Sequence, residues 1–337
     1  MCGGQCPTAR RTRRSRRRSF KPRSTRACPP RSRRSGSRTA CWRSWVALTE
    51  TIAFVGLGNM GVPMSRRLVE AGYRVLGADP SAAAQASAAA FGVTIVKDAA
   101  AAAAASDVLI LMLPNSDVVE TVLLDDRVAA ALRPGARVID MSSSEPVRTR
   151  TLAGEIARRA AALIDAPVSG GVRGAREGTL TVMAGGDPAD VDAVSGILAT
   201  FGRVRHVGPT GSGHALKALN NLLSATHLWA TSEAVLIAER FGVSPAAALD
   251  VVNGSSGRSG SSEAKWPSFI LPGTYDSGFS VGLMAKDVGI AVGLMEQLGL
   301  TSDVGRAVLA DWCRAADDLG AAADHTEVAR WISERLA

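Results

Sequence analysis

The chain has 337 residues, enough for one large or two ordinary domains, and 46% of them are apolar, which excludes a wholly disordered protein. No stretch of about 18 residues is free of charged or strongly polar side chains, so neither a transmembrane helix nor a membrane partner is expected. The formal net charge of +8 does not describe the main part of the chain. Residues 1–49 carry 15 Lys or Arg and no acidic residue, which leaves a mildly acidic remainder of 24 basic and 31 acidic residues.

The basic segment, residues 1–48, is rich in Arg, Ser, Pro and Gly and lacks apolar periodicity, so we expect it to be disordered. Three interpretations stay open: a nucleic-acid-binding tail, an organelle-targeting peptide, or in-frame translation upstream of a start near residues 46–51, which we favour. Only Cys313 lies beyond this segment, so neither a disulfide framework nor a metal site is expected. This cysteine usage fits a reducing compartment, the cytoplasm or, in a eukaryote, the mitochondrial matrix.

From Thr51 the pattern alternates between strand-like and helix-like segments. Strands are expected at residues 52–55, 73–78, 93–96, 107–113, 136–141, 163–166, 179–184 and 204–207. Helices are expected between them at residues 60–71, 81–91, 99–105, 146–162 and 188–200. Such crossovers predict an α/β fold over residues 49–208, a Rossmann-type, doubly wound and mostly parallel sheet with helices on both faces.

Beyond Gly208 only helical periodicity remains. The expected helices are at residues 212–241, 245–252, 281–298, 302–317 and 325–336. They predict an all-α domain over residues 209–337, joined to the sheet by the long first helix.

A glycine-rich turn, Gly56-Leu57-Gly58-Asn59-Met60-Gly61, links the first strand to the first helix with G-x-G-x-x-G spacing. Such a turn can hold a pyrophosphate on the N–H groups of the helix N-terminus. The pattern is weak alone, but Asp79 ends the second strand, where a carboxylate can accept hydrogen bonds from both ribose hydroxyls of a dinucleotide. The alternative is that Asp79 caps the helix that starts near Ser81.

A Ser-Gly-Gly turn, Ser169 to Gly171, follows the carboxyl end of a strand, where open α/β sheets bind ligands. Its backbone N–H groups and hydroxyl could hold a carboxylate, and an ordinary turn is the alternative.

The long helix opens with Gly213, Lys217 and Asn221 on one face, with the glycine leaving room for a ligand. Lys217 could act as a general acid or base, or could extend to water. Farther on, Lys286 and Asp287 interrupt an apolar helix. Lys286 could reach the nicotinamide or the substrate, and a surface ion pair is the alternative.

Five motifs in this order carry a resemblance: G-L-G-N-M-G at 56–61, D-A-P-V-S-G-G at 165–171, G-x-G-x-x-x-K-x-x-N-N at 211–221, S-S-G-R-S at 255–259 and L-M-A-K-D at 283–287. From residue 51 to the C-terminus the chain resembles the β-hydroxyacid dehydrogenase family, most closely 3-hydroxyisobutyrate dehydrogenases. The resemblance implies that Lys217 is catalytic and that the substrate is bound by Ser169, Gly170, Gly171 and Asn221. It implies that the cofactor is contacted by Gly56, Leu57, Gly58, Asn59, Met60, Gly61, Asp79, Leu113, Pro114, Ser143 and Lys286.

The expected activity is that of an oxidoreductase acting on CH–OH groups, which transfers a hydride between NAD and a small β-hydroxy acid or semialdehyde. NAD is favoured over NADP because Asp79, followed by Pro80, would repel a 2′-phosphate, and relatives that use NADP often have an arginine there. His214 is expected to pack or face solvent and not to be catalytic. The resemblance also suggests a homodimer or homotetramer.

Other functions stay open. The chain could be a tartronate semialdehyde reductase or another semialdehyde reductase of the family, although residues 255–259 favour hydroxyisobutyrate. The presence of Lys217 argues against an imine reductase. A non-enzymatic alternative is a nucleotide-binding interaction protein whose basic tail binds nucleic acid, since no nucleic acid partner is expected for the body.

Overall fold

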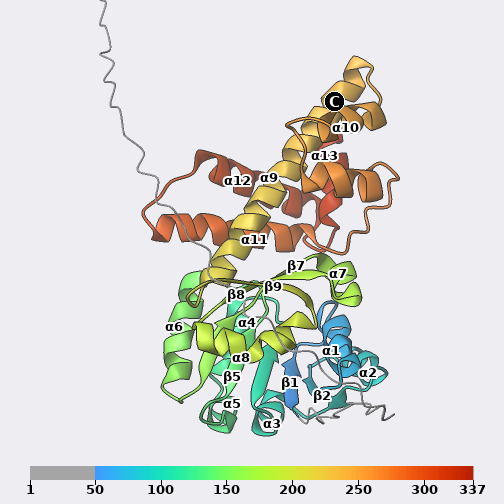
Figure 1. The fold of residues 1–337 in the computed structure, drawn as a ribbon. Coiled ribbons are helices and arrows are strands. Elements are labelled where there is room, and N and C mark those ends of the chain that lie inside the picture. Colours follow the sequence, from blue (N-terminus) through green and yellow to red (C-terminus); the bar gives the residue numbers. More distant parts are fainter. Residues whose placement is uncertain (1–49, 337) are drawn as a thin grey trace, which may run out of the picture. The chain divides into compact units, whose positions relative to one another are not determined.

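The computed structural model describes residues 50–336, so the expectations for the basic segment 1–48 lie outside the described residues. In the described part, the first half alternates strands and helices, and the second half is helical (Figure 1). Both features confirm the fold class expected from the sequence.

The sheet has nine strands in the order β3-β2-β1-β4-β5-β6-β8-β7, with β9 paired to β8. Neighbours from β3 to β6 are parallel, β8 runs antiparallel to β6 and β7, and β9 is parallel to β8. The order 3-2-1-4-5-6 is the doubly wound arrangement, which binds ligands at the carboxyl ends of its strands. The strands are β1 (Thr51–Val55), β2 (Arg74–Ala78), β3 (Thr94–Ile95), β4 (Val108–Leu111), β5 (Arg137–Asp140), β6 (Ala162–Asp165), β7 (Val168–Ser169), β8 (Leu180–Gly185) and β9 (Gly202–Gly208).

Helices cover both faces of this sheet, and alternate residues of the central strand show how. Ile52 and Phe54 of β1 pack into one apolar cluster, whereas Ala53 and Val55 pack into another on the opposite face. The helices are α1 (Gly61–Glu70), α2 (Ala82–Ala89), α3 (Ala99–Ala104), α4 (Ser116–Leu123), α5 (Asp126–Ala131), α6 (Pro146–Ala157), α7 (Gly171–Glu177) and α8 (Pro188–Ala199). Three of them, α4, α5 and α7, are absent from the sequence expectations.

The helical half is built on one long helix. Trp266, Trp312 and Trp331 from three of its elements are buried in a common core with Leu228 and Val235 of that helix. The elements are α9 (Ser212–Phe241), α10 (Pro245–Asn253), the π-helix η1 (Ser261–Ile270), α11 (Val281–Gln297), α12 (Asp303–Leu319), the 3₁₀ turn η2 (His325–Glu327) and α13 (Val328–Arg335). The π-helix was not expected from the sequence, and the terminal helix begins three residues later than predicted.

Helix α9 starts inside the sheet half, held by the buried carboxylate of Asp165 at the end of β6. One carboxylate oxygen accepts from the Gly211 N–H at 2.7 Å and the other from the His214 N–H at 2.8 Å. Burial raises the pKa of Asp165, and the nearby His214 and these two N–H groups oppose the rise. The first turns of α9 are therefore fixed to the carboxyl edge of the sheet.

Gly213 explains how closely α9 approaches the sheet. A Cβ atom added there would lie 2.2 Å from the Met183 carbonyl oxygen and within 3 Å of two Asp165 oxygens. The glycine therefore makes room for protein backbone, and the sequence-based interpretation that it makes room for a ligand is wrong.

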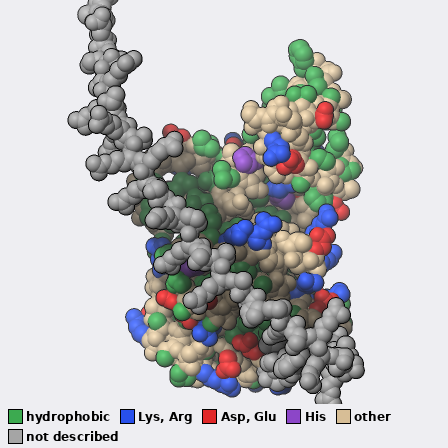
Figure 2. Space-filling model, in the orientation of Figure 1, with side chains coloured by type: hydrophobic (Ala, Val, Ile, Leu, Met, Phe, Trp, Pro, Cys, Tyr) green, Lys and Arg blue, Asp and Glu red, His purple; other side chains and the backbone are tan. Residues whose placement is uncertain are grey.

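Exposed basic and acidic side chains are interspersed over the visible face of the described residues (Figure 2). Within residues 50–336, none of the helices has both the length and the apolar composition needed to cross a bilayer.

Candidate active site

The glycine turn after β1 uses its three glycines in two ways. Gly56 has φ +94°, and a Cβ atom there would lie 2.2 Å from the Met112 carbonyl oxygen, while a Cβ atom on Gly61 would lie 1.9 Å from the Gly56 carbonyl oxygen. These two positions need glycine for the turn and for helix packing. Gly58 instead faces open space, with nothing within 4 Å of an added Cβ atom.

The backbone N–H groups around Gly58 are available for a ligand. Among the described residues, the N–H groups of Asn59, Met60 and Gly61 have no hydrogen-bond acceptor, and no side chain caps α1. The open position beside unpaired donors at a helix N-terminus has the form of an anion site and fits the pyrophosphate of a dinucleotide.

Asp79 lies where β2 ends, and its carboxylate braces the glycine turn. Oδ2 accepts from the Leu57 N–H at 2.7 Å, and Oδ1 accepts from the Ser81 N–H at 2.8 Å. The N-cap of α2 is Ser81, whose hydroxyl accepts from the Ala84 N–H, so the alternative that Asp79 caps this helix is wrong. Each carboxylate oxygen retains a lone pair, so the ribose contact stays a prediction.

The loops after β4 and β5 meet beside the glycine turn. The Leu113 N–H donates to the Ser142 hydroxyl at 2.9 Å, and Asp140 holds the second loop through the Ser142 N–H and the Ser144 hydroxyl. Pro114 and Ser143 lie in these two loops. The predicted cofactor contacts Leu113, Pro114 and Ser143 therefore belong to one braced edge.

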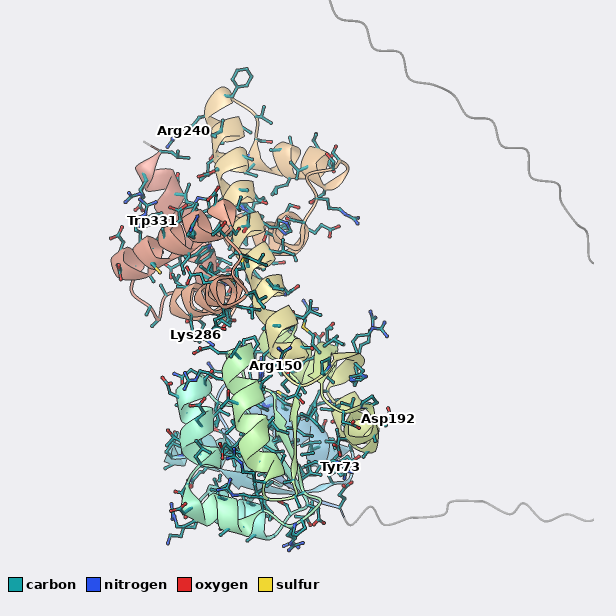
Figure 3. All side chains as sticks on the ribbon, turned by 90° about the vertical axis from the view of Figure 1, so that its left-hand side faces the viewer. Tyr73, Arg150, Asp192, Arg240, Lys286 and Trp331 are labelled. Atoms are coloured by element: carbon teal, nitrogen blue, oxygen red, sulfur yellow. The ribbon has the colours of Figure 1, made fainter. Side chains whose placement is uncertain are left out.

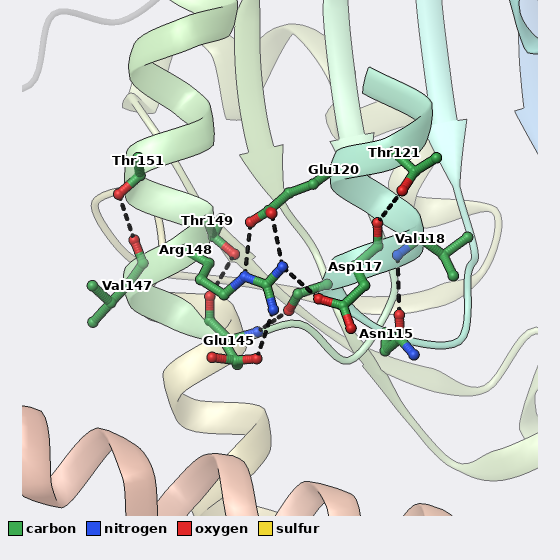
Figure 4. A network of polar contacts seen from close by, with 11 residues as sticks. Asn115, Asp117, Val118, Glu120, Thr121, Glu145, Val147, Arg148, Thr149 and Thr151 are labelled. Atoms are coloured by element: carbon green, nitrogen blue, oxygen red, sulfur yellow. Dashed lines mark hydrogen bonds and ion pairs between the residues drawn. The ribbon is translucent and has the colours of Figure 1, made fainter. Parts of the chain in front are cut away.

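A second brace lies outside these loops, where Arg148 of α6 joins α4 (Figure 4). Its guanidinium donates to Glu120 at 2.7 and 2.8 Å, to Asp117 at 2.7 Å and to Glu145 at 3.1 Å. The hydrogen bonds to Glu120 and Asp117 hold the pKa of Arg148 above its usual range, against a smaller effect of burial. Arg148 could not be singled out from the sequence because two of its partners, Asp117 and Glu120, lie in α4, a helix that was not expected.

Three side chains and one backbone carbonyl form a polar chain between α9, α11 and the sheet. The Asn221 amide donates to Asp287 Oδ2 at 2.5 Å, the Lys286 ammonium lies 2.9 Å from Asp287 Oδ1, and Lys286 also donates to the Ser143 carbonyl oxygen at 2.9 Å. Figure 3 shows Lys286 on the side of α11 towards the sheet. Asp287 is 1% exposed, so the alternative of a surface Lys-Asp pair is wrong.

Lys217 precedes Asn221 by one turn on the same face of α9, which brings its amine towards this polar chain. The amine is partly buried and makes no hydrogen bond to the described residues. Burial lowers the pKa of Lys217, the Asp287 carboxylate opposes that change and the Lys286 charge adds to it. Extension to bulk water, the alternative open at the sequence level, does not describe this side chain.

The Ser-Gly-Gly segment is less open than expected. Ser169 pairs with Thr181 in the short antiparallel β7–β8 ladder, so it belongs to a strand and not to a free turn. Gly170 and Gly171 have φ +132° and +62°, and an added Cβ atom on Gly171 would meet nothing within 4 Å. The segment has no direct hydrogen bond to Lys217 or Asn221, so its role in substrate binding stays a prediction.

Two further residues, His214 of α9 and Lys265 of η1, lie close to the candidate site. His214 is 1% exposed, and its Nδ1 lies 2.8 Å from the Thr149 hydroxyl. It therefore packs at the base of α9, which is the first of the two positions expected from the sequence. Lys265 of η1, which the sequence did not single out, donates to the Ser224 hydroxyl of α9 at 2.9 Å. Its position beside α9 could have been found only from the fold.

A cavity of about 260 Å³ opens between the start of α6 and α11. It is lined by Glu145, Pro146, Lys286, Gly289, Ile290, Gly293, Leu294 and Gln297. Lys286 thus faces the cavity while its ammonium holds the Ser143 loop.

Comparison with known families agrees with this geometry. Residues 51–208 match the model for the NAD binding domain of 6-phosphogluconate dehydrogenase. Residues 211–332 match the model described as NAD-binding of NADP-dependent 3-hydroxyisobutyrate dehydrogenase.

Individual relatives match over most of their length. A 2-(hydroxymethyl)glutarate dehydrogenase of Eubacterium barkeri is 38% identical over 243 residues, which are 72% of this chain and 81% of the relative. An NAD-dependent L-serine dehydrogenase of Pseudomonas aeruginosa is 36% identical over 248 residues, 71% of this chain and 83% of the relative. The structure of Mycobacterium tuberculosis 3-hydroxyisobutyrate dehydrogenase with L-serine superposes with a TM-score of 0.80 at 35% identity, covering 85% of this chain and 99% of that one.

The braced cofactor edge, the polar chain that reaches it from α9 and α11, and these matches over both halves confirm the resemblance: the chain belongs to the β-hydroxyacid dehydrogenase family, among its 3-hydroxyisobutyrate dehydrogenase-like members.

Proposed function

We propose that the protein is an NAD-dependent dehydrogenase that interconverts a small β-hydroxy acid and its semialdehyde, with Lys217 as the general acid and base. The observation that carries the proposal is the continuous polar chain from Asn221 through Asp287 and Lys286 to the Ser143 carbonyl oxygen. It connects the helix face that bears Lys217 to the braced loops at the carboxyl edge of the sheet. This connection supports a proton donor on α9 that acts beside the cofactor edge.

The cofactor fits the residues present. Gly58 leaves space for a pyrophosphate, and the N–H groups of Asn59, Met60 and Gly61 are free to donate to it. NAD, when bound, supplies the nicotinamide carbon that accepts the hydride. Asp79 supports NAD over NADP, because a fixed carboxylate at the end of β2 repels a 2′-phosphate and can accept from ribose hydroxyls.

Lys217 is suited to proton transfer. Burial lowers the pKa of its amine, so the neutral base is accessible closer to neutral pH than for an exposed lysine. During oxidation the amine takes the proton of the substrate hydroxyl, and during reduction the ammonium returns it. The Asn221 amide donates to Asp287 at 2.5 Å and its oxygen accepts from the Asn220 amide at 3.4 Å, so Asn221 is fixed one turn after Lys217, where it positions the substrate.

The substrate carboxylate has a candidate site at Gly170 and Gly171. Both have positive φ, and the space next to the Gly171 Cα atom is open, so an anion can approach the backbone N–H groups. Ser169 adds a hydroxyl from the adjoining strand.

The direct test combines a substrate panel with Lys217→Ala. NADH formation is measured with 3-hydroxyisobutyrate, 3-hydroxypropionate, 4-hydroxybutyrate, glycerate and threonate, and we expect turnover of at least one of them. Lys217→Ala lowers kcat by about 10²- to 10⁴-fold while the Kd for NAD, measured by calorimetry, stays within twofold. The matched control is Arg74→Ala, which removes an exposed cation at the amino end of β2, the sheet edge away from the site, and keeps wild-type kinetics. Near-normal turnover by Lys217→Ala would refute the role of this residue.

A homo-oligomeric state is also proposed. It is supported by large apolar side chains that α9 leaves exposed, namely Leu216, Leu223, Ile237 and Phe241. Light scattering after gel filtration tests it, and a monomer at micromolar concentration would contradict it.

A further inference from the structure

Lys265 lies on the same side of α9 as the proposed catalytic lysine. Its ammonium donates to Ser224, which follows Lys217 by seven residues and Asn221 by three. At about 100° per residue, these three positions share one helix face, and Lys217 and Ser224 are about 10 Å apart along the axis. A second amine thus sits farther along the helix face that presents Lys217.

The two amines are close enough to affect one another. The pKa of Lys265 is lowered to about 8, first by burial and then by the positive charge of Lys217, while Asp324 acts in the opposite direction. A partly buried lysine beside another cation is unfavourable without a nearby anion.

Within residues 50–336, no acidic side chain forms an ion pair with the Lys265 ammonium. Asp324 is the acidic group whose charge reaches Lys265, but its carboxylate accepts from the Ser277 hydroxyl, the Gly278 N–H and Thr326, and it forms no ion pair with Lys265. Burial opposes ionisation of Asp324, yet its hydrogen bonds, first that with His325, outweigh burial and keep its pKa below the usual range. Asp324 is thus satisfied by its own turn.

The remaining groups near Lys265 form no ion pair with it either. His325 is 3% exposed, and burial lowers its pKa, so it is a neutral neighbour. Asp287 is committed to Asn221 and Lys286. Lys265 therefore has one neutral acceptor, Ser224, and free donor capacity.

We propose that Lys265, positioned by Ser224, binds a second anionic group at the far end of the substrate side chain, so that the preferred substrates are β-hydroxy acids carrying a second carboxylate. This inference rests on the proposed function. It adds a substrate class: the first carboxylate lies at the Ser169–Gly171 segment, the hydroxyl lies at Lys217, and the second carboxylate lies at Lys265 after a short methylene spacer. A charge-assisted hydrogen bond to the distal carboxylate then supplies the direct ion pair that Asp324 does not make.

The test compares two substrates that differ at the far end. The dianionic probe is 2-(hydroxymethyl)glutarate, and the control is 2-(hydroxymethyl)pentanoate, in which a methyl group replaces the distal carboxylate. The wild-type enzyme is expected to show a kcat/KM at least tenfold higher for the dianion. Lys265→Met removes the charge at similar length, and it should lower kcat/KM for the dianion by about 10- to 100-fold.

The same variant carries its own control. Turnover of 2-(hydroxymethyl)pentanoate by Lys265→Met should stay within about threefold of wild type, which shows that the fold and Lys217 are intact, and Lys265→Arg should restore most of the preference for the dianion. Equal activity of the wild type on both substrates, or an equal loss on both in Lys265→Met, would overturn the distal carboxylate site while leaving the dehydrogenase intact. No oxidation of either substrate, or of the hydroxy acid panel, would instead refute the proposed function.

Discussion

A single methyl group at Gly213 should separate the sheet from the helix that carries Lys217. In Gly213→Ala, the new Cβ atom would begin 2.2 Å from the Met183 carbonyl oxygen and 2.8 and 2.9 Å from two oxygens of Asp165. The obstacles are backbone atoms and a buried carboxylate already bonded to the same helix, so no flexible side chain can move aside.

The size of the effect follows from these contacts. Reaching an ordinary contact of 3.4 Å requires the helix and strand to part by about 1.2 Å at this point. Overpacking of this kind destabilises a protein by about 1–3 kcal/mol. A displacement of about 1 Å in a catalytic group lowers activity by about 10²-fold. We therefore expect a lower kcat with a nearly unchanged Kd for NAD, since the glycine turn after β1 is not touched.

Two measurements check this prediction, the denaturation midpoint and the kcat for the best substrate of the panel. The matched control is Gly154→Ala in α6, where an added Cβ atom meets nothing within 4 Å and alanine should stabilise the helix by about 0.5–1 kcal/mol. If Gly213 instead made room for substrate, the variant would keep its stability and show only a raised KM. That result would refute the packing argument.

Three further outcomes follow from charges in the site. In Asp79→Asn the ratio of kcat/KM for NAD to that for NADP should fall at least tenfold because repulsion of the 2′-phosphate is lost, and an unchanged ratio would contradict the role of Asp79. In Asp287→Asn the pKa of Lys217 should fall further, because the charge that raises it is removed, so the rise of oxidation kcat/KM with pH should move to lower pH; a move to higher pH would be inconsistent. The preference for a dianionic substrate should decline above pH 8, because Lys265, whose neighbours are Asp324, Lys217 and His325, loses its proton there. The measurement is the ratio of kcat/KM for the two substrates, in which the titration of Lys217 cancels. A ratio independent of pH would rule out this role.

The sequence was sufficient for the parts of the fold whose signal is local. Strand β4 and residues 52–55 of β1 are continuous apolar runs, and α9 keeps helical periodicity over 30 residues, so their type and order could be predicted. Helices α4, α5 and α7 have six to eight residues, too few turns for a periodic pattern to stand out. The π-helix η1 contains Pro267, which argues against any helix in a sequence-based prediction.

The candidate site likewise contains contacts that the local sequence predicts and contacts that it does not. Lys217 and Asn221 share a face by their spacing alone, so their association could be predicted. The burial of Asp287 depends on Asn221, 66 residues away, and the position of Lys265 depends on Ser224, 41 residues away. Neither contact leaves a trace in the local sequence, where Lys265 stands between Ala264 and Trp266 with nothing to distinguish it from a surface lysine.

The anchoring of α9 also limits how the enzyme can admit its ligands. This helix, about 45 Å long, is locked into the sheet by Asp165 at one end and forms part of the tryptophan-rich core farther along. The two halves cannot open by a rigid-body hinge motion without bending α9 or breaking its buried hydrogen bonds to Asp165. Entry and release must therefore depend on local rearrangement, such as a rotamer change that frees the Lys286 ammonium from the Ser143 carbonyl, rather than on a hinge between domains.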